Sequence, residues 1–267
     1  MQTWGVQGRS EVWVGEQSGK TQDRGEVVPA TDCVVACASV APKGNKKYVA
    51  LTFDEGPSGA TKQIMQVLKE KGVTATFFLS GDAAEASSAT AKAIVDAGCE
   101  IGSNSYSDDS LKGRDREAVR EQITKGTDAI KSATGVKTML LRAPYAAFDE
   151  QNWIDAMDLV SAVVSWNIDS GDWLLNGADE QVSTVLDSVT PGNIVLLTDR
   201  DECAEQTLEA LPQIIDGLIA DGYKIVTLSD LVKTDTSLSK KLTSLTKAAM
   251  PKDAVFPQLA EDDDTTE

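Results

Sequence analysis

The feature that most constrains the fold is a repeated alternation of short apolar segments with amphipathic segments of helical spacing. Seven apolar segments have the length and composition of buried strands, and they begin at Tyr48, Val73, Cys99, Lys137, Ser161, Asn193 and Tyr223. Between them, apolar residues recur three or four positions apart, as in Ile64, Val67 and Leu68. Alternating strands and helices predict a parallel α/β sheet with its helices outside. The alternation alone fits both a closed barrel and an open, doubly wound sheet.

Polar residues follow the ends of most of these predicted strands. They are Asp54 and Glu55, Asn104, Arg142, Asp169 and Asp172, and Thr198. In α/β barrels the carboxyl ends of the strands meet at one rim, where binding and catalytic residues gather. The polar residues therefore favour a distorted (β/α) barrel of about seven parallel strands with a pocket at that rim.

Changes in composition divide the chain into three parts. Residues 1–47 are rich in Gly, Gln, Lys and charged side chains, and we expect an N-terminal extension with short extended segments around EVWVGE and VVPATDCVVA. Residues 48–232 hold the strand–helix pattern and form the main domain. Residues 233–267 end in EDDDTTE and are expected to be an acidic, partly disordered tail.

Charge and hydropathy limit the partners of the protein. The formal net charge is −17, and a strongly acidic chain lacks the basic footprint that phosphate binding needs, so no nucleic-acid partner is expected. No segment reaches the ~18 apolar residues of a membrane-spanning helix. The first residues, MQTWGVQGRS, do not have the pattern of a signal peptide.

The chain has four cysteines and no histidine. A zinc site would need all four thiols, and their spacing does not form two CxxC-type pairs. We expect free or singly paired thiols. Cys33 and Cys37 are a better candidate pair than Cys99 and Cys203, which are expected at opposite ends of the barrel.

Five motifs in order resemble the NodB-homology polysaccharide deacetylases, carbohydrate esterase family 4. TFDEGPS at 52–58 resembles TFDDGPS, and GCEIGSNSYSD at 98–108 resembles GHEIGNHTYSH. RAPY at 142–145 resembles RxPY, DSGDW at 169–173 resembles DxxDW, and IVLLTD at 194–199 resembles the LLHD motif. The resemblance covers residues 48–232, and it implies a glycoside hydrolase/deacetylase-like barrel that hydrolyses carbon–nitrogen bonds of N-acetylated sugars.

The resemblance also implies roles for individual residues. Asp54 matches the general base, Arg142 the residue that orients it, and Asp172 the carboxylate that partners the catalytic histidine. Thr198 stands in place of that histidine. The positions of the metal ligands hold Glu55, Asn104 and Asp108. Tyr145, Trp173 and Leu196 match the substrate groove, and the Tyr145 amide matches the oxyanion donor.

The replaced residues change the expected chemistry. Zinc favours imidazole, whereas Glu55, Asn104 and Asp108 offer only oxygen, so we expect no tightly bound cofactor and at most a weakly held Mg, Ca or Mn ion. Asn104 and Asp108 would otherwise be loop hydrogen-bonding residues. A threonine hydroxyl has a pKa too high to donate a proton usefully to a leaving amine, which removes a contribution of ~10²–10⁴ in rate. The Asp54–Arg142 pair would also persist for stability alone.

Three functional hypotheses follow. The first is an impaired or inactive deacetylase homologue that still binds an N-acetylated glycan, such as peptidoglycan or another amino-sugar polymer. The second is an active amidohydrolase with Asp54 as base and an oxygen-ligated cation. The third is a non-catalytic glycan-binding or interaction domain of the cell envelope. An extracytoplasmic location follows from the resemblance alone.

Overall fold

The computed structural model describes residues 13–14, 34–36, 40, 42, 44 and 46–235, except 157 and 161. These residues form one sheet of ten strands. The strands are β1 (Trp13–Val14), β2 (Val34–Ala36), β3 (Tyr48–Asp54), β4 (Thr76–Leu79), β5 (Glu100–Ser103), β6 (Leu140–Leu141), β7 (Ala162–Val164), β8 (Ile168–Asp169), β9 (Ile194–Thr198) and β10 (Lys224–Val226).

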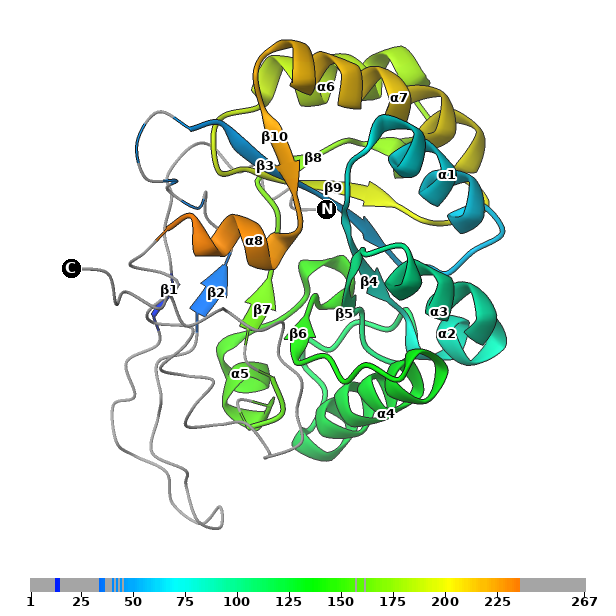
Figure 1. Cartoon of the computed structure of the whole chain (residues 1–267). Helices are drawn as coiled ribbons and strands as arrows, with labels where there is room; N and C mark the ends of the chain where they lie inside the picture. Colours follow the sequence, from blue (N-terminus) through cyan, green and yellow to red (C-terminus); the bar gives the residue numbers. More distant parts are fainter. Residues whose placement is uncertain are drawn as a thin grey trace, which may run out of the picture.

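The strands are parallel except for the β1–β2 pair, in the order β1-β2-β7-β6-β5-β4-β3-β9-β8. The first half of β3 also pairs with β10, through Tyr48 and Lys224. The second half of β3 pairs with β4, so β10 and β4 pair with successive parts of β3. The sheet curves into a distorted barrel with helices around it (Figure 1). In the described residues, the order of strands does not close on itself between β8 and β1.

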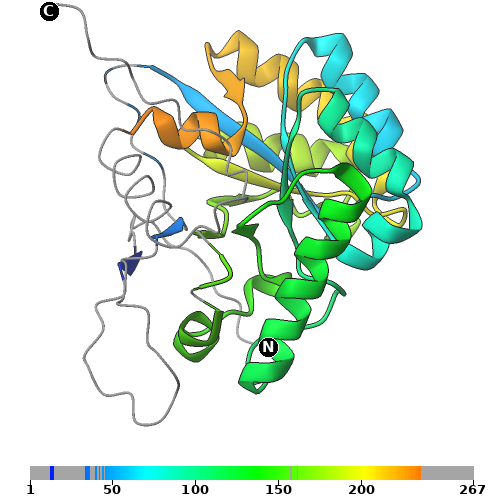
Figure 2. The same ribbon diagram turned by 60° about the horizontal axis from the view of Figure 1, so that its bottom comes forward.

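The helices are α1 (Thr61–Lys71), α2 (Gly81–Ala86), α3 (Ser88–Asp96), α4 (Arg116–Thr134), α5 (Glu150–Ala156), α6 (Ala178–Ser188), α7 (Ala204–Ala220) and α8 (Leu228–Lys233), with short 3₁₀ turns at Pro144–Ala146 (η1) and Asp172–Leu174 (η2). Figure 2 shows α1, α3 and α4 along one outer side of the sheet. None of the described helices is both long enough and apolar enough to cross a bilayer.

Strand β3 shows how alternation divides the core into two. Val49, Leu51 and Phe53 pack in the cluster between the sheet and helices α1 and α7. Ala50 belongs to the cluster inside the barrel, which α8 covers at one end with Leu228, Leu231 and Val232. Successive side chains of a strand point to opposite faces, so Thr52 and Asp54 share the inner face with Ala50. The sequence TFD thus carries a carboxylate to the inner rim of the barrel.

The expected barrel with outer helices is confirmed, with two differences. The predicted strand from Ser161 is two strands, β7 and β8, and the chain changes neighbours between them: β7 pairs with β6, and β8 pairs with β9. The predicted set of seven also did not include β1 and β2, although short extended segments were expected there. Helix α1 ends as expected at Gly72, which has a left-handed φ of 68°. Helices α2, α3, α5 and α8 were not predicted, because their apolar stripes are short.

Candidate functional site at the carboxyl rim

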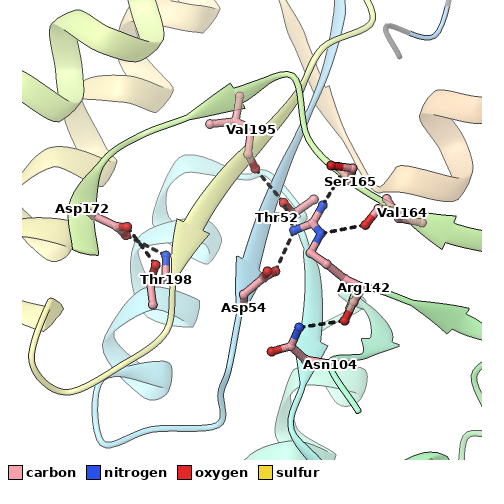
Figure 3. Close-up of polar contacts among 9 residues, drawn as sticks. All are labelled: Thr52, Asp54, Asn104, Arg142, Val164, Ser165, Asp172, Val195 and Thr198. Atoms are coloured by element: carbon pink, nitrogen blue, oxygen red, sulfur yellow. Dashed lines mark hydrogen bonds and ion pairs between the residues drawn. The ribbon is translucent and has the colours of Figure 1, made fainter. Parts of the chain in front are cut away.

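The centre of the site is an ion pair between Asp54 and Arg142. Nη1 of Arg142 lies 2.6 Å from Oδ1 of Asp54 and donates to Oγ1 of Thr52 at 2.7 Å. Nε and Nη2 donate to the carbonyls of Val164 and Ser165 at 3.3 and 3.1 Å. Figure 3 shows the guanidinium with these partners. Arg142 is fully buried, and these contacts hold its guanidinium and the Asp54 carboxylate in one orientation.

A second polar pair joins β9 to η2. Oγ1 of Thr198 donates to Oδ1 of Asp172 at 2.8 Å, and the Thr198 amide donates to Oδ2 at 2.6 Å (Figure 3). Oγ1 of Thr207 also donates to Oδ2, at 3.1 Å. The carboxylate is therefore satisfied by hydroxyl and amide donors, and the Thr198 hydroxyl proton is committed to Asp172.

The third group is built around Arg200, which follows β9. Nη2 of Arg200 forms an ion pair with Glu55 and donates to Oδ2 of Asp108 at 2.9 Å. The hydroxyl of Tyr145 donates to the same Asp108 oxygen at 2.6 Å. Glu55 and Asp108, two of the three predicted metal positions, are thus brought together by a guanidinium.

Asn104, the third predicted metal position, does not join that cluster. Its Nδ2 donates to the Arg142 carbonyl at 2.8 Å (Figure 3), as expected of a loop hydrogen-bonding residue. Its Oδ1 is buried and has no hydrogen-bond partner in the described part of the chain. A buried amide oxygen left without a donor is uncommon in folded proteins.

Exposed apolar side chains lie beside these polar groups at the rim. Tyr145 is 66% exposed and Trp173 is 54% exposed, next to the half-exposed Leu174 and Leu175 of the following turn. Nε1 of Trp173 donates to Asp169 at 3.2 Å, which orients the indole. Leu196, the third predicted groove residue, is buried within β9 at 6% exposure and cannot line an open groove, so of the three only Tyr145 and Trp173 are exposed.

Backbone conformation at the site is unusual. Glu55 and Tyr145 both have left-handed φ values, 76° and 60°. Non-glycine residues seldom adopt this region, and those that do cluster at functional sites. Gly56 is required by space, because a Cβ there would lie 2.1 Å from Oδ2 of Asp199. Asp199 in turn accepts hydrogen bonds from Ser58 and Thr61, which fixes the turn after β3.

Burial dominates the electrostatics of the carboxylates. Desolvation raises the pKa of Asp54 to about 6, although the adjacent Arg142 acts in the opposite direction. Desolvation raises the pKa of Glu55 to about 7, against the effect of Arg200. The pKa of Asp172 is also raised by burial. At neutral pH Asp54 is mostly ionised, and it can accept a proton from a water or hydroxyl placed beside it.

The residues at the predicted metal position do not fit a divalent cation as they stand. Two carboxylates remain, but the nitrogen of Arg200 lies between them and carries a positive charge. Across the described residues, no three Asp, Glu, Cys or His side chains lie together in a way that could hold a metal ion. Imidazole, the ligand that zinc favours, is absent from the whole sequence.

Arg200 is the residue that sequence reasoning missed. It lies outside every motif that carried the family resemblance, and its side chain reaches back across the rim from the segment after β9. The available signal was an arginine two positions after the last strand-end residue, Thr198. Cys99 and Cys203 are both free, as expected, whereas Cys33 and Cys37 lie outside the described residues.

Comparison with known proteins agrees with this fold and site. The family model described as polysaccharide deacetylase matches residues 41–160. A peptidoglycan-N-acetylglucosamine deacetylase of Bacillus cereus is 32% identical over 217 residues, which are 80% of this chain and 79% of the relative. A bifunctional xylanase/deacetylase of Pseudobutyrivibrio xylanivorans is 36% identical over 70% of this chain, and the match spans 31% of that longer relative.

The chain therefore belongs to the polysaccharide deacetylase family. Among solved structures it is similar to a pseudoenzyme of carbohydrate esterase family 4 from Bacillus anthracis. That similarity has a TM-score of 0.68 at 30% identity, over 76% of this chain and 69% of the other. The (β/α) barrel expected from the strand–helix alternation together with the polar strand-end residues matches the fold of these solved structures.

Proposed function

We propose that this protein is a catalytically impaired or inactive polysaccharide deacetylase that binds an N-acetylated glycan, such as peptidoglycan or another amino-sugar polymer, at its carboxyl rim. The observation that carries the proposal is the Thr198–Asp172 hydrogen bond. The side chain in the position of the proton donor is a hydroxyl that donates its hydrogen bond to the Asp172 carboxylate. The pKa of a hydroxyl lies far from the working pH, so it cannot act as an efficient general acid.

The metal position supports the same conclusion. Deacetylation in this family resembles other metal-assisted hydrolysis, in which the ion activates a water and polarises a carbonyl. Here a guanidinium takes the space between Glu55 and Asp108. A pseudoenzyme has precedent in this fold, since a mutant of the Bacillus anthracis relative is described as having restored enzymatic activity.

The exposed rim supports glycan binding. Tyr145 and Trp173 offer flat faces beside buried polar groups, and Leu174 and Leu175 extend the apolar edge. Large amphipathic rings of this kind bury much area while keeping a polar contact, here Trp173 to Asp169 and Tyr145 to Asp108. A place of action at the cell envelope follows as part of the proposal, because several relatives are named as peptidoglycan deacetylases.

Acetate release and glycan binding test the proposal separately. Acetate is measured from N-acetylglucosamine oligomers with added Mg, Ca, Mn or Zn, beside an Asp54→Asn control. Binding of the same oligomers is measured by calorimetry for the wild type, Trp173→Ala and Ile219→Ala. Ile219 is a matched control, because it is also about half exposed but lies on the outer helix α7.

We expect no acetate above the Asp54→Asn level. We also expect oligomer binding that weakens roughly tenfold in Trp173→Ala and is unchanged in Ile219→Ala. Acetate release that depends on Asp54 and an added metal would instead establish the active amidohydrolase. If the protein neither releases acetate nor binds the oligomers, the result would favour an envelope interaction domain that does not use this rim.

A further inference from the structure

We infer that Arg200 is the resident cation of the rim site formed by Glu55 and Asp108. Its guanidinium lies between Glu55 and Asp108 where a divalent ion would lie, offsets part of their negative charge, and keeps metal ions out of this position. The inference does not depend on whether the pocket binds a glycan. It predicts that a divalent-cation site is latent in this chain and that one side chain masks it.

The geometry centres on a single atom. Nη2 of Arg200 contacts both carboxylates, through an ion pair with Glu55 and at 2.9 Å from Oδ2 of Asp108. The two oxygens therefore face one point in space, as two of the ligands of a bound cation would. Tyr145 adds a donor to the Asp108 oxygen and holds it in place.

The three residues come from three separate segments of the rim. Glu55 follows β3, Asp108 lies in the loop after β5, and Arg200 follows β9. Glu55 has a left-handed backbone, stabilised in part by its amide, which donates to the Phe78 carbonyl at 3.0 Å. A surface ion pair of adjacent residues would need no such convergence. The fold itself has gathered two acids around one position, and an arginine fills it.

Charge explains why the guanidinium and a metal exclude each other. Two carboxylates near one point attract a positive charge strongly, and the attraction grows in the low dielectric of a half-buried pocket. With Arg200 present, the local charge is already balanced to within about one unit, and a divalent ion would meet a fixed positive neighbour. Without Arg200, two hard oxygen donors face water, and they suit Mn²⁺, Ca²⁺ or Mg²⁺ rather than zinc.

The experiment titrates the full-length chain with Mn²⁺ and follows bound ion by electron paramagnetic resonance. The variants are Arg200→Met, Glu55→Gln, Arg200→Met with Glu55→Gln, and Arg114→Met. Arg114 is the matched control, since its side chain is 36% exposed against 39% for Arg200 and it pairs with Asp109. The acidic run EDDDTTE also attracts cations weakly. Only the Mn²⁺ binding that Glu55→Gln removes is therefore assigned to the rim site.

We expect Arg200→Met to bind one Mn²⁺ at least about tenfold more tightly than the wild type and Arg114→Met, and the added Glu55→Gln to abolish the gain. A folded Arg200→Met protein with no gain would overturn the inference. So would a wild type that already binds one Mn²⁺ in a manner that Glu55→Gln removes. The wild-type measurement can overturn the inference on its own, and Arg200→Gln takes the place of Arg200→Met, with the same expected gain, if the Met variant does not fold.

Discussion

At the scale of single residues, the Asp54–Arg142 pair joins stability to the shape of the site. Arg142 is fully buried and donates to one carboxylate, one hydroxyl and two carbonyls. Its guanidinium also stacks 4.1 Å from the Phe78 ring centroid. Each of these groups is left without its partner if the arginine is removed. The pair therefore persists whether or not the protein hydrolyses anything.

Arg142→Met should destabilise the protein by about 3–5 kcal/mol, because it leaves the buried Asp54 without its counter-charge. Arg120→Met is the control, since Arg120 pairs with Asp158 at the surface and should cost at most ~1 kcal/mol. Urea denaturation followed by far-ultraviolet circular dichroism measures both. An equal loss of unfolding free energy in the two variants would show that the buried Asp54–Arg142 pair stabilises the fold no more than a surface ion pair does.

Glu55 makes a pH-dependent contribution. Its pKa is about 7 in the folded protein against an ordinary value of 4.5, so the folded state holds the proton more tightly than the unfolded chain. Its stabilising contribution is complete below pH 4.5 and is lost as the pH rises through 7. Glu55→Gln should therefore flatten the fall in unfolding free energy between about pH 5 and 7.5, by about 1 kcal/mol after solvent screening.

Denaturation of the wild type and Glu55→Gln at both pH values checks this. Asp54, whose pKa is also raised, titrates in both proteins, so the comparison reports Glu55 together with its charge coupling to Asp54. An unchanged slope in the Gln variant would contradict the assigned burial of Glu55.

At the scale of elements, helix α4 fixes the loop that carries Asp108. Gly126 lets the helix approach this loop closely, because a Cβ would lie 2.5 Å from the Ser105 carbonyl oxygen and 2.8 Å from the Tyr106 amide. The loop thus rests on a backbone contact at the one point of α4 that has no side chain. The spacing of Val119, Ile123 and Ile130 predicted the helix, but not this contact.

Gly126→Ala should destabilise the protein by about 1–3 kcal/mol, since backbone atoms cannot move aside as a side-chain end can. Gly217→Ala on α7 is the comparison. The nearest atoms to its Cβ would all belong to the flexible side chain of Leu186, and the gain in helix propensity of ~1 kcal/mol offsets that contact. Thermal unfolding by calorimetry ranks the two. A Gly126→Ala protein as stable as Gly217→Ala would show that the loop backbone shifts to accommodate the added methyl group at little cost.

At the scale of the whole molecule, the net charge of −17 opposes compactness at neutral pH. Raising NaCl from about 10 to 300 mM shortens the screening length several-fold, so the melting temperature at pH 7 should rise by roughly 2–5 °C. Near about pH 5, where more carboxylates are protonated, the rise should be much smaller. Calorimetry at both pH values tests this. A melting temperature that falls with salt at pH 7 would mean that attractive surface pairs outweigh the net repulsion.

The sequence by itself determined the barrel and most of its rim. Alternating strands and helices predict a parallel sheet, and polar residues at strand ends predict one rim, because parallel strands all end on the same side. Asp54, Arg142, Asp172 and Thr198 lie in the polar pairs there, as their positions indicated. These inferences succeeded because strand direction and side-chain alternation are local properties.

Only the tertiary structure decided what lies at the predicted metal position. Arg200 contacts Glu55 and Asp108, which precede it in the sequence by 145 and 92 residues. Its long side chain has many rotamers, and neither period nor motif indicates which one the fold selects. The same holds for Asn104, which bonds to the Arg142 carbonyl instead of joining the two acids. The end of a strand can be read from local pattern, whereas the meeting of three loops depends on the packing of the complete barrel.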